Sequence, residues 1–145
     1  MNRKTQKKPS GDSDDGLLVG SGEHADVFLF GEAKEEYEAL EQRNDQTSMR
    51  EYRTISRYFQ RYADMGAQHL DDTAFKKQDR RSSGGTTVMI FEFKAYQFRV
   101  YGCVGERNGK RCFRGTACDP SKKKNKADPQ KLQKAADEYV RIVNG

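Results

Sequence analysis

The chain of 145 residues contains no tryptophan, three prolines and two histidines. No apolar run approaches the roughly 18 residues of a membrane-spanning helix, and the N-terminal stretch lacks the apolar segment of a secretory signal peptide. We therefore expect a soluble, cytoplasmic protein that does not bind a membrane. Its three cysteines, Cys103, Cys112 and Cys118, should be reduced there, and no two of them have the close spacing typical of a zinc site. The sequence thus predicts no metal and no other cofactor.

Positive charge is concentrated in the second half of the chain. Residues 32–72 contain ten acidic and six basic side chains, whereas residues 86–145 contain six acidic and thirteen basic ones. Such an asymmetry favours a polyanionic partner, such as a nucleic acid, on one surface. The alternative is a charged surface that contacts only water.

The pattern of apolar residues predicts a polar tail over residues 1–24 and one α+β domain over residues 25–145. The tail has few apolar residues, which is typical of disorder. Alternation and helical spacing predict a strand over 25–30, helices over about 32–43 and 48–64, a loop over 69–85, strands near 86–95, 97–105 and 110–117, and a helix from Asp128-Pro129. We expect two N-terminal helices on one face of a sheet of four or five mainly antiparallel strands, plus a C-terminal helix on the same face.

Asn108 and Gly109 separate two alternating runs, a pattern typical of a two-residue hairpin turn. This turn predicts the cross-strand pairs Arg107 with Lys110, Val104 with Phe113, Cys103 with Arg114, and Tyr101 with Thr116. Because side chains alternate between the faces of a strand, Arg99, Tyr101 and Arg114 should share one face. We expect this face to be open to solvent and to hold the phosphate and base of a nucleic acid. A sheet face that is merely hydrated is the alternative.

Lysines at the rim of this face are candidates for contacts with RNA phosphates. Lys76 and Lys77 lie in the predicted loop, and Lys122, Lys123 and Lys124 follow the last predicted strand. Lysines of this kind add affinity that depends on salt concentration. A mobile basic loop is the alternative.

Three further side chains are candidates for proton transfer. His69 is a lone histidine in a predicted loop, and Asp119 is the acid best placed near the end of the last strand. Tyr139 lies on the apolar stripe of the final helix, where a role in the core is the alternative.

The order of elements and four segments resemble the RelE/ParE toxin superfamily, and within it the HigB-like, phage-associated branch. The segments are ADVFLFGEAKEEYEAL, TAFKKQD, FEFKAYQFRVYG and SKKKNKADPQKLQKAADEY. In the third, Lys94 stands where the family commonly has an arginine, which makes it a further candidate for RNA binding. The resemblance covers residues 25–143 and implies a RelE-like fold.

The resemblance also implies a function. Such a protein is the toxin of a type II toxin–antitoxin system, a metal-independent endoribonuclease that cleaves mRNA on the translating ribosome until a small, DNA-binding antitoxin silences it. In the family, basic side chains stabilise the charged phosphorane, which implies catalytic roles for Arg99, Arg114 and Tyr101. Two alternatives remain: a gyrase-inhibiting toxin of the ParE type, and a non-catalytic RNA-binding module of the same fold.

Overall fold

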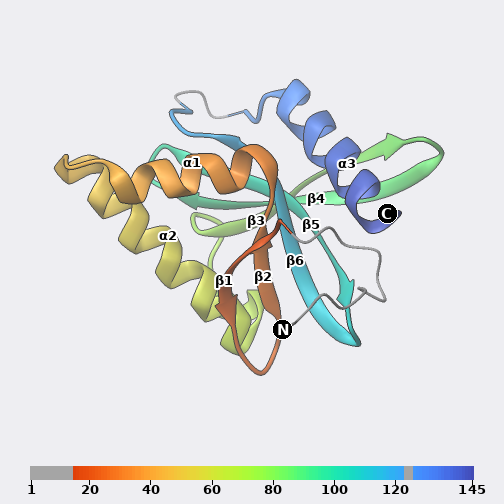
Figure 1. Cartoon of the computed structure of the whole chain (residues 1–145), viewed down its shortest axis with the longest axis horizontal. Helices are drawn as coiled ribbons and strands as arrows, with labels where there is room; N and C mark the ends of the chain where they lie inside the picture. The colour runs from red at the N-terminus through yellow and green to blue at the C-terminus, as the bar shows by residue number, and fades with distance from the viewer. Residues whose placement is uncertain (1–14, 123–125) are drawn as a thin grey trace.

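The computed structural model describes residues 15–122 and 126–145 (Figure 1). In chain order the elements are β1 (Leu17–Ser21), β2 (Asp26–Leu29), α1 (Gly31–Gln42), α2 (Gln46–Met65), the 3-10 helix η1 (Ala67–His69), β3 (Phe75–Ser83), β4 (Thr86–Ala95), β5 (Phe98–Arg107), β6 (Lys110–Asp119) and α3 (Pro129–Val143). The strands form one sheet in the order β1-β2-β6-β5-β4-β3. The sheet is mixed, because β2 is parallel to β6 whereas the other neighbours are antiparallel.

The helices α1 and α2 lie together on one side of the sheet (Figure 1). Between them and the sheet is a hydrophobic core rich in aromatic rings. The ring of Phe93 lies with its centroid 4.9, 4.6 and 4.9 Å from those of Phe59, Phe75 and Phe113. These four rings come from β4, α2, β3 and β6. Aromatic side chains bury the largest apolar areas in a core, so this cluster fixes α2 against three strands at once.

The helix α3 covers the opposite face, where a second core forms. Small residues allow a close approach, since Ala135 and Ala136 are fully buried and Thr116 Oγ1 of β6 donates a hydrogen bond to the Ala135 carbonyl at 2.8 Å. The helix begins at Asp128-Pro129 as predicted. The expectation that all helices share one face is wrong, because α3 finds its apolar partners on the other side of the sheet.

The predicted sheet of four or five mainly antiparallel strands is also wrong, because the described residues form a mixed sheet of six strands, two of which precede α1. Residues 17–21, which fall within the predicted polar tail over residues 1–24, form β1 and pair with β2. Residues 75–83, predicted as loop, form β3. This strand is polar because it is an edge strand, and Gly84 and Gly85, with φ of 56° and 86°, make its tight turn to β4.

The strand predicted over residues 25–30 is confirmed over Asp26–Leu29. This strand, β2, pairs with β1 on one side and with β6 on the other. In the parts of the chain that the structure describes, no helix is both long and apolar enough to cross a membrane.

The hairpin at Asn108-Gly109 has the predicted register near its turn. The pairs Arg107–Lys110, Val104–Phe113 and Cys103–Arg114 are all present. Beyond them a β-bulge shifts the register, so that Tyr101 pairs with Ala117 instead of Thr116. Gly102 lies at the bulge, where a Cβ atom would collide with the Arg114 carbonyl. The bulge sets which side chains at the end of β6 face α3.

Candidate nucleic-acid interface

Charged side chains gather where the ends of β4, β5 and β6 meet the segment that leads to α3. We call this group the strand-end cluster, and its members are Lys76, Glu92, Lys94, Arg99, Asp119 and Lys122. The sheet register places five of them in two adjacent rows: Lys76 pairs with Glu92, and Lys94 pairs with Arg99, which also pairs with Asp119. Lys122 follows the end of β6. A cavity of about 640 Å³ opens beside the cluster, lined by Asp119, Ser121, Lys122, Lys126, Ala127, Asp128 and Pro129.

Arg99 is held in place by two acceptors. Its Nε lies 3.4 Å from Glu92 Oε2, and its Nη1 donates a hydrogen bond to the Tyr96 carbonyl. Glu92 is buried and also accepts a hydrogen bond from Gln78 Nε2. Arg99 is 8% exposed. A guanidinium has five N–H donors in a fixed plane, so these contacts orient it without using all of its donors.

Lys122 belongs to the same cluster. Its backbone N–H donates a hydrogen bond to the Gln97 carbonyl at 2.9 Å, which ties the segment after β6 to the β4–β5 turn. Burial lowers the pKa of Lys122, and the positive charge of Arg99 lowers it further, against the opposite influence of Glu92 and Asp119. A lysine with a lowered pKa gives up its proton more readily than an ordinary lysine.

Tyr101 lies beneath α3 and is fully buried. Burial raises the pKa of its hydroxyl, and the charges of Glu92 and Asp119 raise it further, so the hydroxyl stays protonated. Among the described residues, no hydrogen-bond partner lies within reach of this hydroxyl. The ring has no exposed face on which a base can stack, and the hydroxyl oxygen is buried as well, so Tyr101 does not lie open to a ligand as predicted.

Arg114 lies on the same sheet face as Arg99 and Tyr101, as predicted, but that face is covered by α3 rather than open to solvent. Arg114 is fully buried: its Nη2 donates to the Glu106 carbonyl at 3.0 Å, and its guanidinium lies 5.8 Å from the centre of the Tyr139 ring. Arg114 pairs with Cys103, which is four residues from Arg99 along β5. Four residues of an extended strand span about 13 Å. The two arginines therefore do not converge on one phosphate.

The predicted rim lysines separate into two groups. Lys76 and Lys94 belong to the strand-end cluster, and both are partly buried. Lys77 pairs with Phe91, whose ring stacks on Phe75 in the α2-side core, so Lys77 lies on the other face. Lys123 and Lys124 lie outside the described residues.

The candidates for proton transfer also separate. Asp119 is partly buried in the strand-end cluster, where its Oδ1 accepts a hydrogen bond from the Ser121 N–H at 3.3 Å. Tyr139 packs against the second core. His69 is exposed in η1. No hydrogen bond or ion pair among the described side chains joins His69 to the cluster.

Sequence reasoning missed Tyr96, which forms the β4–β5 turn with Gln97. Tyr96 has φ of 58° and is 49% exposed, and the Arg50 guanidinium lies 4.5 Å from its ring centre. The short gap between the predicted strands locates this turn. The contact with Arg50 joins residues that are far apart in the chain, and no local pattern predicts it. Glu92 was also missed, because an alternating strand gives no sign of which acid will be buried.

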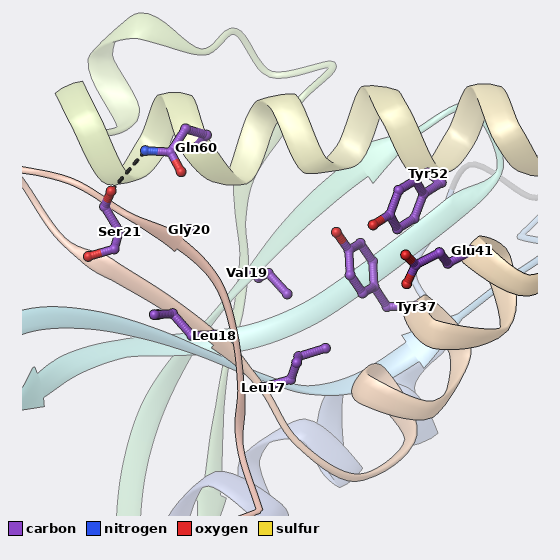
Figure 2. Close-up of a pocket in the computed structure, with 9 residues that line it drawn as sticks. All are labelled: Leu17, Leu18, Val19, Gly20, Ser21, Tyr37, Glu41, Tyr52 and Gln60. Carbon is purple, nitrogen blue, oxygen red and sulfur yellow. Dashed lines mark hydrogen bonds between the residues drawn. The ribbon is translucent and has the colours of Figure 1, made fainter.

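A second hollow, of about 450 Å³, lies between β1, α1 and α2 (Figure 2). It is lined by Leu17, Leu18, Val19, Gly20, Ser21, Tyr37, Glu41, Tyr52 and Gln60. The rings of Tyr37 and Tyr52 lie together on one side of it, with centroids 5.0 Å apart, and Gln60 bridges the other side to the Ser21 carbonyl (Figure 2). Its lining includes a carboxylate but no basic side chain, so the strand-end cluster is better suited to a polyanion.

Within residues 15–122 and 126–145, no group of three or more His, Cys, Asp or Glu side chains is arranged to hold a metal ion. Comparisons with models of known protein families, with curated protein sequences and with solved structures find no match to this chain.

Proposed function

We propose that the protein is a cytoplasmic endoribonuclease that cleaves mRNA on the translating ribosome, as the toxin of a type II toxin–antitoxin system. The observation that carries this proposal is the strand-end cluster, in which Lys76, Lys94, Arg99 and Lys122 surround two carboxylates beside a cavity. The resemblance of four segments to HigB-like toxins supports it independently. In this proposal a small, DNA-binding antitoxin protein keeps the toxin silent.

The chemistry needs no metal, because the attacking group belongs to the RNA. The Asp119 carboxylate accepts the proton of the ribose 2′-hydroxyl while the bond from that oxygen to phosphorus forms. Arg99 offsets the charge that develops on the phosphorane. The bond from phosphorus to the 5′-oxygen then breaks, and the ammonium of Lys122 supplies the proton to that oxygen. The products are a 2′,3′-cyclic phosphate and a 5′-hydroxyl.

Burial of the cluster favours a second candidate, a module that binds RNA without cleaving it. Arg99 is already paired with Glu92, and a phosphate has to compete with that contact. In such a module the same cations hold the RNA backbone, but no proton is transferred.

The test is to add the purified protein to translating ribosomes with a defined mRNA and to map the ends of the fragments. We expect cleavage that persists with a metal chelator and leaves 2′,3′-cyclic phosphates. Arg99→Lys should slow cleavage by about 10²-fold or more, because the planar guanidinium with its paired N–H donors is lost. Glu92 keeps a cationic neighbour in this variant. Lys77→Ala, on the other sheet face, is the matched control and should cleave normally.

The remaining outcomes separate the alternatives. Binding of RNA without any cleavage would replace the toxin by the RNA-binding module. Broken DNA in a reaction with gyrase, with intact mRNA, would instead support the ParE-type alternative.

A further inference from the structure

The β4–β5 turn contains a side chain that the proposed cleavage chemistry does not use. Tyr96 occupies the left-handed backbone region, with φ of 58°, at a position where glycine, asparagine or aspartate is usual. The residue is 49% exposed, so burial does not explain the choice of tyrosine. An unfavourable backbone conformation that presents an exposed ring is typical of a residue that binds a ligand.

The ring is held in a defined position. The Arg50 guanidinium lies 4.5 Å from its centre, which supports one face of the ring and leaves part of it open to solvent. The turn itself is fixed from three directions. Glu51 of α2 accepts the Gln97 N–H at 3.3 Å, Arg99 donates to the Tyr96 carbonyl, and Lys122 N–H donates to the Gln97 carbonyl.

The surroundings of the ring indicate the class of ligand. Two residues of the strand-end cluster, Arg99 and Lys122, bond directly to the turn, and Arg50 adds a cation beside the ring. A single exposed ring among cations is not the extended apolar patch that a protein partner covers. It is the combination with which proteins bind single-stranded nucleic acid, where an aromatic ring stacks on a base and cations contact the phosphates.

We propose that Tyr96, supported by Arg50, is the platform on which an unpaired RNA base stacks while the neighbouring phosphates lie on the strand-end cluster. This inference takes RNA as the ligand from the proposed function, but it concerns binding and not cleavage. Because every base has a face that can stack, the platform tolerates many sequences and sets the position of the RNA rather than its identity.

The test measures binding of a short single-stranded RNA whose nucleotides carry 2′-O-methyl groups, so that cleavage cannot occur. A 2-aminopurine base reports stacking through its fluorescence. Tyr96→Gly removes the ring and also relieves the backbone, so it should melt at the same temperature as the parent or higher. We expect its dissociation constant to rise about 5- to 100-fold, with loss of the fluorescence change. Tyr96→Phe should bind like the parent, and Met49→Ala, at an exposed apolar position of α2, is the matched control.

A second ligand, with an abasic site in place of the stacked nucleotide, completes a cycle. The parent should bind the abasic RNA more weakly than the intact RNA, whereas Tyr96→Gly should bind the two RNAs equally well. If the parent binds RNA and Tyr96→Gly binds it within twofold, the platform is refuted while the proposed function survives. If the parent binds no RNA at all, the platform is refuted as well, and the assay with translating ribosomes decides the proposed function separately.

Discussion

Among the described residues, Arg114 is the largest side chain that the fold encloses completely. Its guanidinium contacts the Glu106 carbonyl and the Tyr139 ring within the protein. From the sequence we expect an arginine open to solvent, so that Arg114→Ala stops toxicity and leaves folding intact. Burial under α3 reverses that expectation, because the side chain now packs as part of the second core.

We predict that Arg114→Ala lowers the free energy of unfolding by about 2–3 kcal/mol, since it removes a charged hydrogen bond and a large buried stem. Urea unfolding followed by circular dichroism measures this. Arg111→Ala, at an exposed position of the same strand, is the control and should change stability little. An Arg114→Ala protein with the parent's stability but no cleavage would return Arg114 to the catalytic set.

At the scale of the elements, Glu32 joins α1, β6 and α3. Its Oε1 lies 2.7 Å from Lys134 Nζ, and its Oε2 lies 2.9 Å from Lys131 Nζ and accepts the Cys118 N–H at 2.7 Å. Burial alone raises the pKa of Glu32, but the hydrogen bonds from Lys134, Cys118 and Lys131 outweigh it and hold this pKa below its usual 4.5. The carboxylate therefore helps to keep α3 on the face that covers Arg114.

This arrangement predicts a dependence on pH. A carboxylate whose pKa is lower in the folded than in the unfolded state adds stability above pH 4.5, and that stability is lost as the pH falls through the folded-state value. At pH 7, Glu32→Gln should lower the free energy of unfolding by about 1 kcal/mol, a value reduced by the partial exposure of the lysines. Below pH 4.5 the difference from the parent should shrink, as measured by urea unfolding at several pH values. Glu35→Gln, at an exposed position of α1, controls for the loss of one charge, and a difference that persists unchanged at pH 3 would contradict the idea.

Local sequence patterns predicted some of the elements and their pairing, but not others. The Asn-Gly turn set the register as far as the Cys103–Arg114 pair, and apolar spacing predicted α1, α2 and α3, because both signals are local. The β-bulge before Tyr101 depends on a contact between backbones and has no such signal. The strand β3 was missed because it is short of apolar residues. The strand β1 was missed because its apolar residues, Leu17, Leu18 and Val19, stand within an otherwise polar segment, and its pairing with β2 has no local signal. The side of the sheet that α3 covers is likewise decided by packing between distant residues.

For the whole molecule, the net charge of +5 is less informative than its uneven distribution. Cations that bind phosphates release counterions from the RNA, so affinity should fall as salt rises, with a log–log slope of about −0.7 per contact on a single strand. We predict that Lys94→Ala makes this slope shallower by about 0.7, because Lys94 lies opposite Arg99 in the strand-end cluster. Fluorescence anisotropy with single-stranded RNA at a series of salt concentrations measures the slope. Lys77→Ala should leave it unchanged, and equal effects of the two substitutions would argue against the cluster as the binding surface.

The parallel pairing of β2 with β6 determines the stage of synthesis at which the sheet can form. Val27 pairs with Phe113, so β2, which is made early on the ribosome, has no partner on that side until β6 has emerged. Sheets that depend on such distant pairs form slowly, because the chain must close a long loop and lose conformational entropy before the stabilising contacts form. The strand-end cluster needs the end of β6 as well, so a nascent chain cannot assemble it. For the nuclease that we propose, this order means that the ribosome making the chain meets no assembled site before β6 has been made and has emerged.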